Sequence, residues 1–282
     1  MESWFLFALL SAIFAGLFNF MLKISAEKNH NSSLVILYSY LSGLTISGIF
    51  LSFNLENLDS LLFIIFLAFI NSLFYFFATL TRIESLKYID TTIYFPLYKT
   101  FSPIFIALIS YFIFTENLTR FEFIGIISGI LVPLLLINQA ENKKQKNMKK
   151  GLIYLLIGII FVLITTSTGK IIMEKDLNLY IYIFFTPLFG LVFSYFTYKK
   201  TYNENHSSHK LKRIGILNGF FYFIMFYTFT LSMKGNLAIV YTINSFSLLI
   251  PILLSVFIYK EHFDKKKTLA IILTILSLYF FQ

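Results

Sequence analysis

The chain has 282 residues, of which 57% are hydrophobic, 20% aromatic and 13% charged. An ordinary soluble domain has about 45–50% apolar and about 25% charged residues, so this composition excludes a soluble globular protein. The apolar residues fall in long blocks rather than in alternating patterns, which predicts membrane-spanning helices instead of a barrel. The net charge is +9, and the absence of Cys removes disulfides, thiolate metal sites and a thiol nucleophile.

A helix that crosses a bilayer needs about 20 apolar residues. We therefore predict an all-α integral membrane protein with ten transmembrane helices and no attached soluble domain. In chain order the ten apolar blocks cover residues 4–22, 34–53, 61–83, 92–115, 121–138, 151–172, 179–198, 214–233, 237–259 and 267–281. The first block has no basic leader and no small-residue cleavage site, so it is predicted to be a retained helix.

The basic residues lie mostly on one side of these predicted helices. Eighteen Lys and Arg fall in alternate connectors, beginning with the one after the first helix, and four fall on the opposite side. Cytoplasmic loops are enriched in Lys and Arg. We therefore predict a multi-pass protein of the cell (cytoplasmic) membrane with both termini outside, and we assign the positive charge to topology rather than to nucleic-acid binding.

An internal repeat relates the two halves of the chain. The matched pairs include Lys23/Lys170, Asn71/Asn218 and Tyr94/Tyr241 at an offset of 147 residues and Glu116/Glu261 at an offset of 145. Each copy holds five helices, an odd number, so the second copy enters the bilayer from the opposite side. The sequence thus predicts two inverted five-helix repeats, the first at residues 1–140 and the second at 151–282, joined by a basic connector at 141–150.

Each half ends with a helix, a glutamate and a last helix. The two stretches are Phe114-Thr115-Glu116-Asn117-Leu118-Thr119 and Ile258-Tyr259-Lys260-Glu261. In this pattern the whole chain resembles the EamA-type members of the drug/metabolite transporter superfamily, although it lacks their usual Gly before the glutamate. The resemblance implies a secondary carrier of small metabolites, often amino acids or related compounds. Ten-helix members are commonly drawn with both termini inside, whereas the charge distribution predicts the opposite here.

Lys99 lies about seven residues, or about 10 Å, inside the fourth predicted helix. A lysine at this depth costs about 2.5–3.5 kcal/mol, so it is expected to face a cavity or a partner. It would either bind a carboxylate or phosphate of the substrate, or bond backbone carbonyls freed by Pro96 and Pro103. Its repeat counterpart Asn244 would line the same cavity from the other half.

Three further pairs of residues are candidate substrate-binding residues. They are Asn71 with Tyr75 in the first repeat, their counterparts Asn218 with Tyr222 in the second repeat, and the counterparts Tyr94 and Tyr241. In the first two pairs the residues stand four apart and share a helix face, so they would line the cavity or hydrogen-bond between helices. The last pair would be interfacial belt residues or aromatic gates.

The first repeat has two extra residues between Tyr94 and Thr100. This surplus predicts that the fourth helix is kinked or locally unwound near Pro96. The ninth helix, in which Pro251 comes later, is expected to stay regular at the matching depth.

Charged and hydroxyl residues near helix ends have default structural roles. Lys170 and Glu174 are spaced for a local ion pair, and Glu116 precedes a helix whose positive N-terminus it would favour. The hydroxyl run at 165–168 would bend its helix or line the pore.

These features predict a secondary transporter, working by alternating access, of a small carboxylate-bearing or zwitterionic metabolite such as an amino acid. A transporter of choline-like quaternary amines with an aromatic cage is one alternative. An integral membrane enzyme is the other, and the chain lacks the motifs that would support it. No catalytic residue, metal, cofactor or nucleic acid is expected. The expected partners are a small-molecule substrate and the lipid bilayer, and the chain is compatible with a monomer.

Overall fold

The structure is a computed structural model that describes residues 3–27, 32–54, 59–86, 88–89, 91–135, 148–201, 209–251, 253–254 and 265–281. Within these ranges every regular element is a helix. The elements are α1 (Ser3–Glu27), α2 (Ser32–Ser52), α3 (Leu61–Leu86), α4 (Thr91–Phe112), α5 (Arg120–Leu135), α6 (Met148–Glu174), α7 (Leu179–Thr201), α8 (His209–Ser232), α9 (Leu237–Ser245), the 3₁₀-helix η3 (Phe246–Leu248) and α11 (Lys265–Phe280).

Seven of these helices, α1 to α4 and α6 to α8, are long and apolar enough to cross a membrane. The helical segments at Leu237–Pro251 and Thr268–Phe280 are also apolar but shorter, and the described part of α5 has 16 residues. Large apolar side chains such as Phe66, Phe196 and Ile275 are more than half exposed. Exposed apolar surface of this extent fits contact with lipid rather than water. The chain is therefore an α-helical membrane protein.

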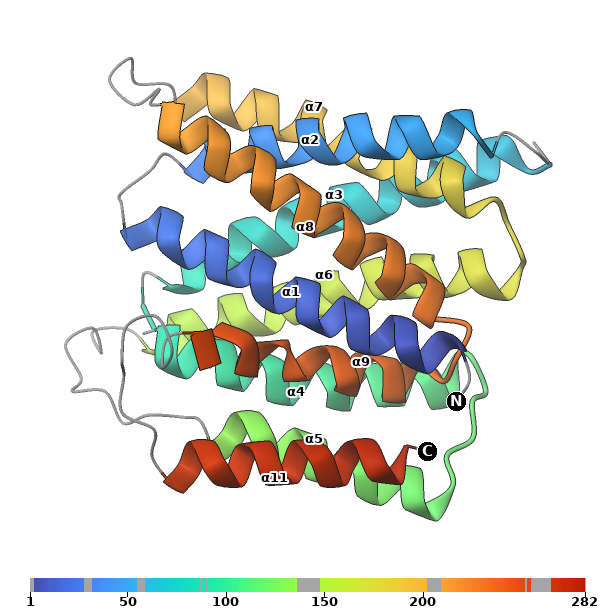
Figure 1. Cartoon of the computed structure of the whole chain (residues 1–282), viewed down its shortest axis with the longest axis vertical. Coiled ribbons are helices and arrows are strands. Elements are labelled where there is room, and N and C mark those ends of the chain that lie inside the picture. Colours follow the sequence, from blue (N-terminus) through green and yellow to red (C-terminus); the bar gives the residue numbers. More distant parts are fainter. Residues whose placement is uncertain are drawn as a thin grey trace.

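The helices run lengthwise between two ends of the molecule, and both termini lie at the same end (Figure 1). We call this the terminal end, where α4, α6 and α8 also finish. The opposite end, where α1, α3 and α7 finish, is called the basic end. Packing joins the two halves of the chain: α3 lies against α6, α1 against α8, α2 against α7, α4 against α9, and α5 against α11.

Helix α4 is one continuous α-helix through Pro96 and Pro103, so the prediction of local unwinding at Pro96 was wrong. The carbonyl that Pro96 leaves without an amide donor belongs to the first turn of α4, where the helix has few bonds to lose. Helix α9 is regular from Leu237 to Ser245, the depth that matches Pro96, as predicted, and it then tightens into the 3₁₀-helix Phe246–Leu248. Because the ring of Pro251 clashes with the carbonyl of Ser247, α-helical geometry is disfavoured at this level.

Small residues let α2 and α8 approach closely. A Cβ added to Gly219 would overlap the carbonyl oxygen of Ser39 and lie 2.6 Å from the Cβ of Ser42. The Oγ of Ser42 donates to the carbonyl of Ile216 at 3.0 Å. Close backbone approach through small residues is the usual basis of helix packing in membranes, and here it fixes the two helices that flank a second cavity described below.

We expect Gly219→Ala to lower the stability of the protein by about 1–3 kcal/mol, because α2 and α8 must separate to admit a methyl group. Gly48→Ala is the matched control on α2, since its Cβ would make an ordinary contact of 3.5 Å with Phe184. Thermal unfolding of the two purified variants in one detergent measures the difference. Equal melting temperatures would contradict this close approach.

Candidate functional site

A central cavity of about 990 Å³, counting its part open to solvent, lies between the two halves of the chain. Its walls come from α1, α3, α4, α6, α7, α8 and α9. The polar lining residues are Asn19, Asn71, Tyr75, Arg82, Tyr98, Lys99, Thr165, Thr166, Tyr182, Tyr222, Thr230, Tyr241 and Asn244. Among the described residues that line it, none is an Asp or Glu.

A second cavity of about 430 Å³ shares Phe18, Tyr75, Arg82 and Tyr222 with the central cavity. Its other walls come from the end of α1, the first half of α2, α3 and α8, and they include Ser39 and Tyr40. These parts of α1, α2 and α3 lie toward the basic end (Figure 1). The two cavities therefore form a continuous set of walls that runs from the centre of the molecule toward that end.

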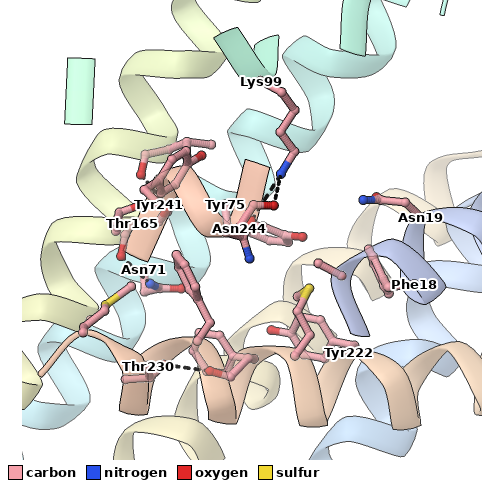
Figure 2. Close-up of a pocket in the computed structure, with 18 of the residues that line it drawn as sticks. Phe18, Asn19, Asn71, Tyr75, Lys99, Thr165, Tyr222, Thr230, Tyr241 and Asn244 are labelled. Atoms are coloured by element: carbon pink, nitrogen blue, oxygen red, sulfur yellow. Dashed lines mark hydrogen bonds between the residues drawn. The ribbon is translucent and has the colours of Figure 1, made fainter. Parts of the chain in front are cut away.

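Lys99 on α4 reaches across the central cavity to Asn244 on α9 (Figure 2). Its ammonium donates to the backbone oxygen of Asn244 at 3.3 Å and to the side-chain Oδ1 at 3.2 Å. The Asn244 amide in turn donates to Ser11 on α1 at 3.5 Å. An ammonium has three donors, so two are used within the protein, and a positive charge stands on the cavity wall with no carboxylate in the described lining.

Arg82, on the last part of α3, is a second cation of the cavity wall. Its guanidinium lies over the ring of Tyr98, with 5.5 Å from Cζ to the ring centroid. Its buried Nε has no hydrogen-bond partner within the described residues. Two basic side chains thus face one cavity, and a guanidinium presents a planar fork that suits a carboxylate or a phosphate.

A hydrogen-bonded chain ties α3 to α6 and α7 beside the cavity. The amide of Asn71 donates to the carbonyl of Thr165 and to the hydroxyl of Thr168, each at 2.9 Å. The Thr168 hydroxyl lies 3.0 Å from that of Tyr182. Asn71 therefore has a structural bond as well as a place on the cavity wall, and the hydroxyl run of α6 supplies its acceptors.

Aromatic rings cover much of the remaining wall. The lining rings are Phe18, Tyr75, Phe95, Tyr98, Tyr182, Tyr222, Phe226, Phe229 and Tyr241. Tyr222 is stacked on Phe226 at 5.8 Å and meets Tyr40 edge-on at 5.4 Å. Rings held in this way present flat apolar faces to a solute, while phenol, amide and hydroxyl groups supply hydrogen bonds between them.

Six of the eight candidate residues, namely Lys99, Asn71, Tyr75, Tyr222, Asn244 and Tyr241, line the central cavity. The other two lie elsewhere. Asn218 lines the second cavity and donates to the hydroxyl of Ser39 at 3.2 Å. Tyr94 is 1% exposed and stacks on Tyr98 at 5.9 Å, so it lies behind the wall. Its ring belongs to a buried apolar cluster between the helices.

Several lining residues were not among the candidates. Arg82 was counted only as a topology charge, because it stands near the end of its apolar block. Nothing in the sequence distinguishes Tyr98 and Tyr182 from the many other aromatic residues of the chain. In the described part of the chain, no group of three His, Cys, Asp or Glu could hold a metal ion.

Substitutions of two residues one turn apart on α3 should distinguish a structural role from a binding role. We expect Asn71→Ala to lower the melting temperature, because it removes two interhelical bonds worth about 0.6 kcal/mol each in membrane proteins. Tyr75→Phe removes only a hydroxyl that faces both cavities, so stability should stay constant while affinity for the transported solute falls. Thermal unfolding and a binding titration on each purified variant check this. A stable Asn71→Ala protein with parental unfolding would contradict the structural role of the amide.

Comparisons with known proteins identify a similar fold and the family of the chain. A solved crystal structure, described in words that state no function, superposes on the chain with a TM-score of 0.80 at 15% sequence identity, over 98% of this chain and 96% of the other. No curated protein matches the sequence. The family described as "Sugar transport protein" matches residues 6–280, and it falls within the EamA/DMT-like class of membrane transporters. The chain belongs to this sugar transport protein family and is a membrane transporter.

Proposed function

We propose that the protein is a secondary transporter in which two inverted five-helix repeats, ten transmembrane helices in all, alternate access to the central cavity. The helix packing supports this arrangement. Exchanging the two repeats turns the α3–α6 contact into the α8–α1 contact, and the α2–α8 contact into the α7–α3 contact, and both members of each pair are present. A cavity at the interface of two such repeats is where substrates of inverted-repeat transporters bind.

The proposed cargo is a small sugar-class solute that carries an acidic group. One observation carries this choice: Arg82 and Lys99 both line a cavity whose described lining contains no carboxylate. A charge inside a membrane protein needs a partner or water, and an anionic group of the cargo would supply the partner. The stacked rings, amides and hydroxyls of the same walls suit the apolar faces and hydroxyls of a sugar, in line with the family.

The other substrate classes fit this cavity less well. A quaternary amine such as choline would meet many aromatic rings, but it would be repelled by two cations on the same walls. A zwitterionic amino acid could use Arg82 and Lys99 for its carboxylate, while its ammonium would find no carboxylate in the described lining. An enzymatic role is disfavoured because the chain belongs to a family of transporters.

Uptake into proteoliposomes tests the function and the cargo separately. Labelled hexose, hexuronate, hexose phosphate, choline and a panel of amino acids are offered, with and without a pH gradient. We expect counterflow of the hexuronate or the hexose phosphate in excess of the neutral hexose. Transport of neutral hexose alone would overturn the acidic group but keep the transporter, and no transport of any solute would count against the function itself.

Lys99→Met should weaken binding of the acidic solute by about 2–5 kcal/mol, the usual loss when one partner of a buried charge pair is truncated. Lys99→Arg should keep part of this affinity. Lys234→Met is the matched control, since Lys234 is exposed in the connector before α9. Binding titrations and melting temperatures are measured on the same preparations. A large loss of melting temperature with unchanged affinity would assign Lys99 to structure instead.

We also propose that both termini lie outside the cell membrane, so that the basic end faces the cytoplasm. The support is the distribution of 18 Lys and Arg against four between the two sides of the predicted helices. A reporter that is active only in the cytoplasm, fused after Gln282, should be inactive, while a periplasmic reporter at the same position should be active. The reverse pattern would overturn this orientation.

A further inference from the structure

The central cavity ends at a tightly packed layer on its terminal side. Gly169 on α6, together with Thr230 on α8 and Met233 just after it, lines the cavity there. A Cβ on Gly169 would lie 2.7 Å from the Sδ of Met233, so α6 and the turn after α8 pack without a gap. The residue that follows Gly169 is Lys170, which is 3% exposed.

The ammonium of Lys170 has all of its donors satisfied by residues of this layer. It donates to the backbone oxygens of Met233 and Gly235, each at 3.0 Å, and it pairs with the carboxylate of Glu116 at 2.5 Å. The local partner expected from the sequence, Glu174, lies farther away at 3.6 Å and is 42% exposed. The short ion pair therefore joins α6 to the connector between α4 and α5, not to its own helix.

Glu116 binds the start of α9 with its other oxygen. Its Oε2 accepts from the backbone N–H of Leu237 at 2.8 Å and from the hydroxyl of Ser110 on α4 at 2.5 Å. A carboxylate at this place also meets the positive N-terminus of α9. One carboxylate of the first half thus holds both α6 and α9 of the second half, directly beyond the cavity.

We propose that the Lys170–Glu116 ion pair is a lock that closes the central cavity at the terminal end and must break when the cavity opens on that side. This proposal rests on the proposed function in one respect: alternating access requires that the cavity open at the terminal end. Two dehydrated charges are stable together, whereas each is costly when separated and still buried. Water therefore enters when Lys170 and Glu116 separate. As a result, the closed and open forms of the terminal end are two distinct arrangements.

The chain offers a convenient test, because it contains no Cys. A single Thr230→Cys reports on access to the terminal part of the cavity, and a Cys appended after Gln282 in a separate protein marks the face that carries the termini. A membrane-impermeant thiol reagent is added to each face of sealed vesicles. The rate of labelling is compared between the parent, Glu116→Gln and Glu174→Gln, each carrying Thr230→Cys.

Glutamine keeps an acceptor for Leu237 but removes the charge that Lys170 pairs with. We expect labelling from the face of the termini to rise by about tenfold or more in Glu116→Gln, within the usual range of coupling energies. Glu174→Gln should label like the parent, because its carboxylate is more distant and partly hydrated. Equal labelling of Glu116→Gln and the parent would overturn the lock.

A second variant avoids leaving one buried charge alone. Glu116→Cys/Lys170→Cys removes both charges and replaces them with two thiols that a short bis-methanethiosulfonate reagent can join, forming a disulfide with each thiol and releasing a sulfinate from each. Cross-linking should abolish transport, and reduction should restore it. Full transport by the cross-linked protein would refute the lock. Because the labelling assay needs no transported solute, a wrong assignment of the cargo would leave its result interpretable.

Discussion

No water reaches the hydrocarbon core of a bilayer, so each polar group that the chain carries into it must bond within the protein or face a hydrated cavity. This constraint organises the polar residues of the structure into two sets. Asn71 bonds Thr165 and Thr168 of α6, and Lys170 bonds the turn after α8 and the connector between α4 and α5. Arg82 and Lys99 stand on the walls of a cavity, where Lys99 also bonds Asn244 of α9. The first set holds helices together, and the second defines what the cavity can accept.

The tied polar groups lie where the halves of the chain meet. Asn71 bonds α3 to α6, and Asn218 bonds α8 to α2 through Ser39. These two asparagines are repeat counterparts in the sequence, yet Asn71 lines the central cavity and Asn218 lines the second one. The same residue type thus stands in different surroundings in the two halves. In the proposed alternating-access cycle, such a difference is expected of a transporter that is open on one side, since two inverted repeats would exchange their conformations when access alternates.

The terminal and basic ends of the molecule also differ from each other. At the terminal end the ion pair of Lys170 and Glu116 closes over the cavity, while toward the basic end the second cavity continues its walls. The repeat counterparts of the ion pair are the side chain of Lys23 and residue Glu261, which lie outside the described residues. The interface between halves combines a polar cavity with a dehydrated ion pair, and both are features that packing against lipid alone would not produce.

The sequence by itself determined the class of the fold, an α-helical membrane protein. For the seven helices that are long enough to cross a membrane, the apolar blocks predicted both ends to within five residues, because the thickness of the bilayer sets the length of a helix. Lys99 was predicted to face a cavity or a partner, since a lysine far inside an apolar block has few explanations, and it lines the central cavity. The internal repeat stays a prediction from the sequence, based on matched polar residues at one offset, which are hard to obtain by chance.

Only the tertiary structure decided which polar side chains meet. A helix face points in a direction that depends on the helix packed against it, and that neighbour is set by close approaches such as Gly219 against Ser39. For this reason Arg82 was missed as a cavity residue, and Tyr94, expected as a belt residue or a gate, lies behind the cavity wall. Lys170 does lie 3.6 Å from its predicted partner Glu174, but it also forms a closer ion pair with Glu116 that the sequence did not predict. The continuous α4 and the 3₁₀ turn of α9 follow the same rule. The effect of a proline depends on where its lost bond falls in a helix, and the sequence does not fix that position until the helix ends are known.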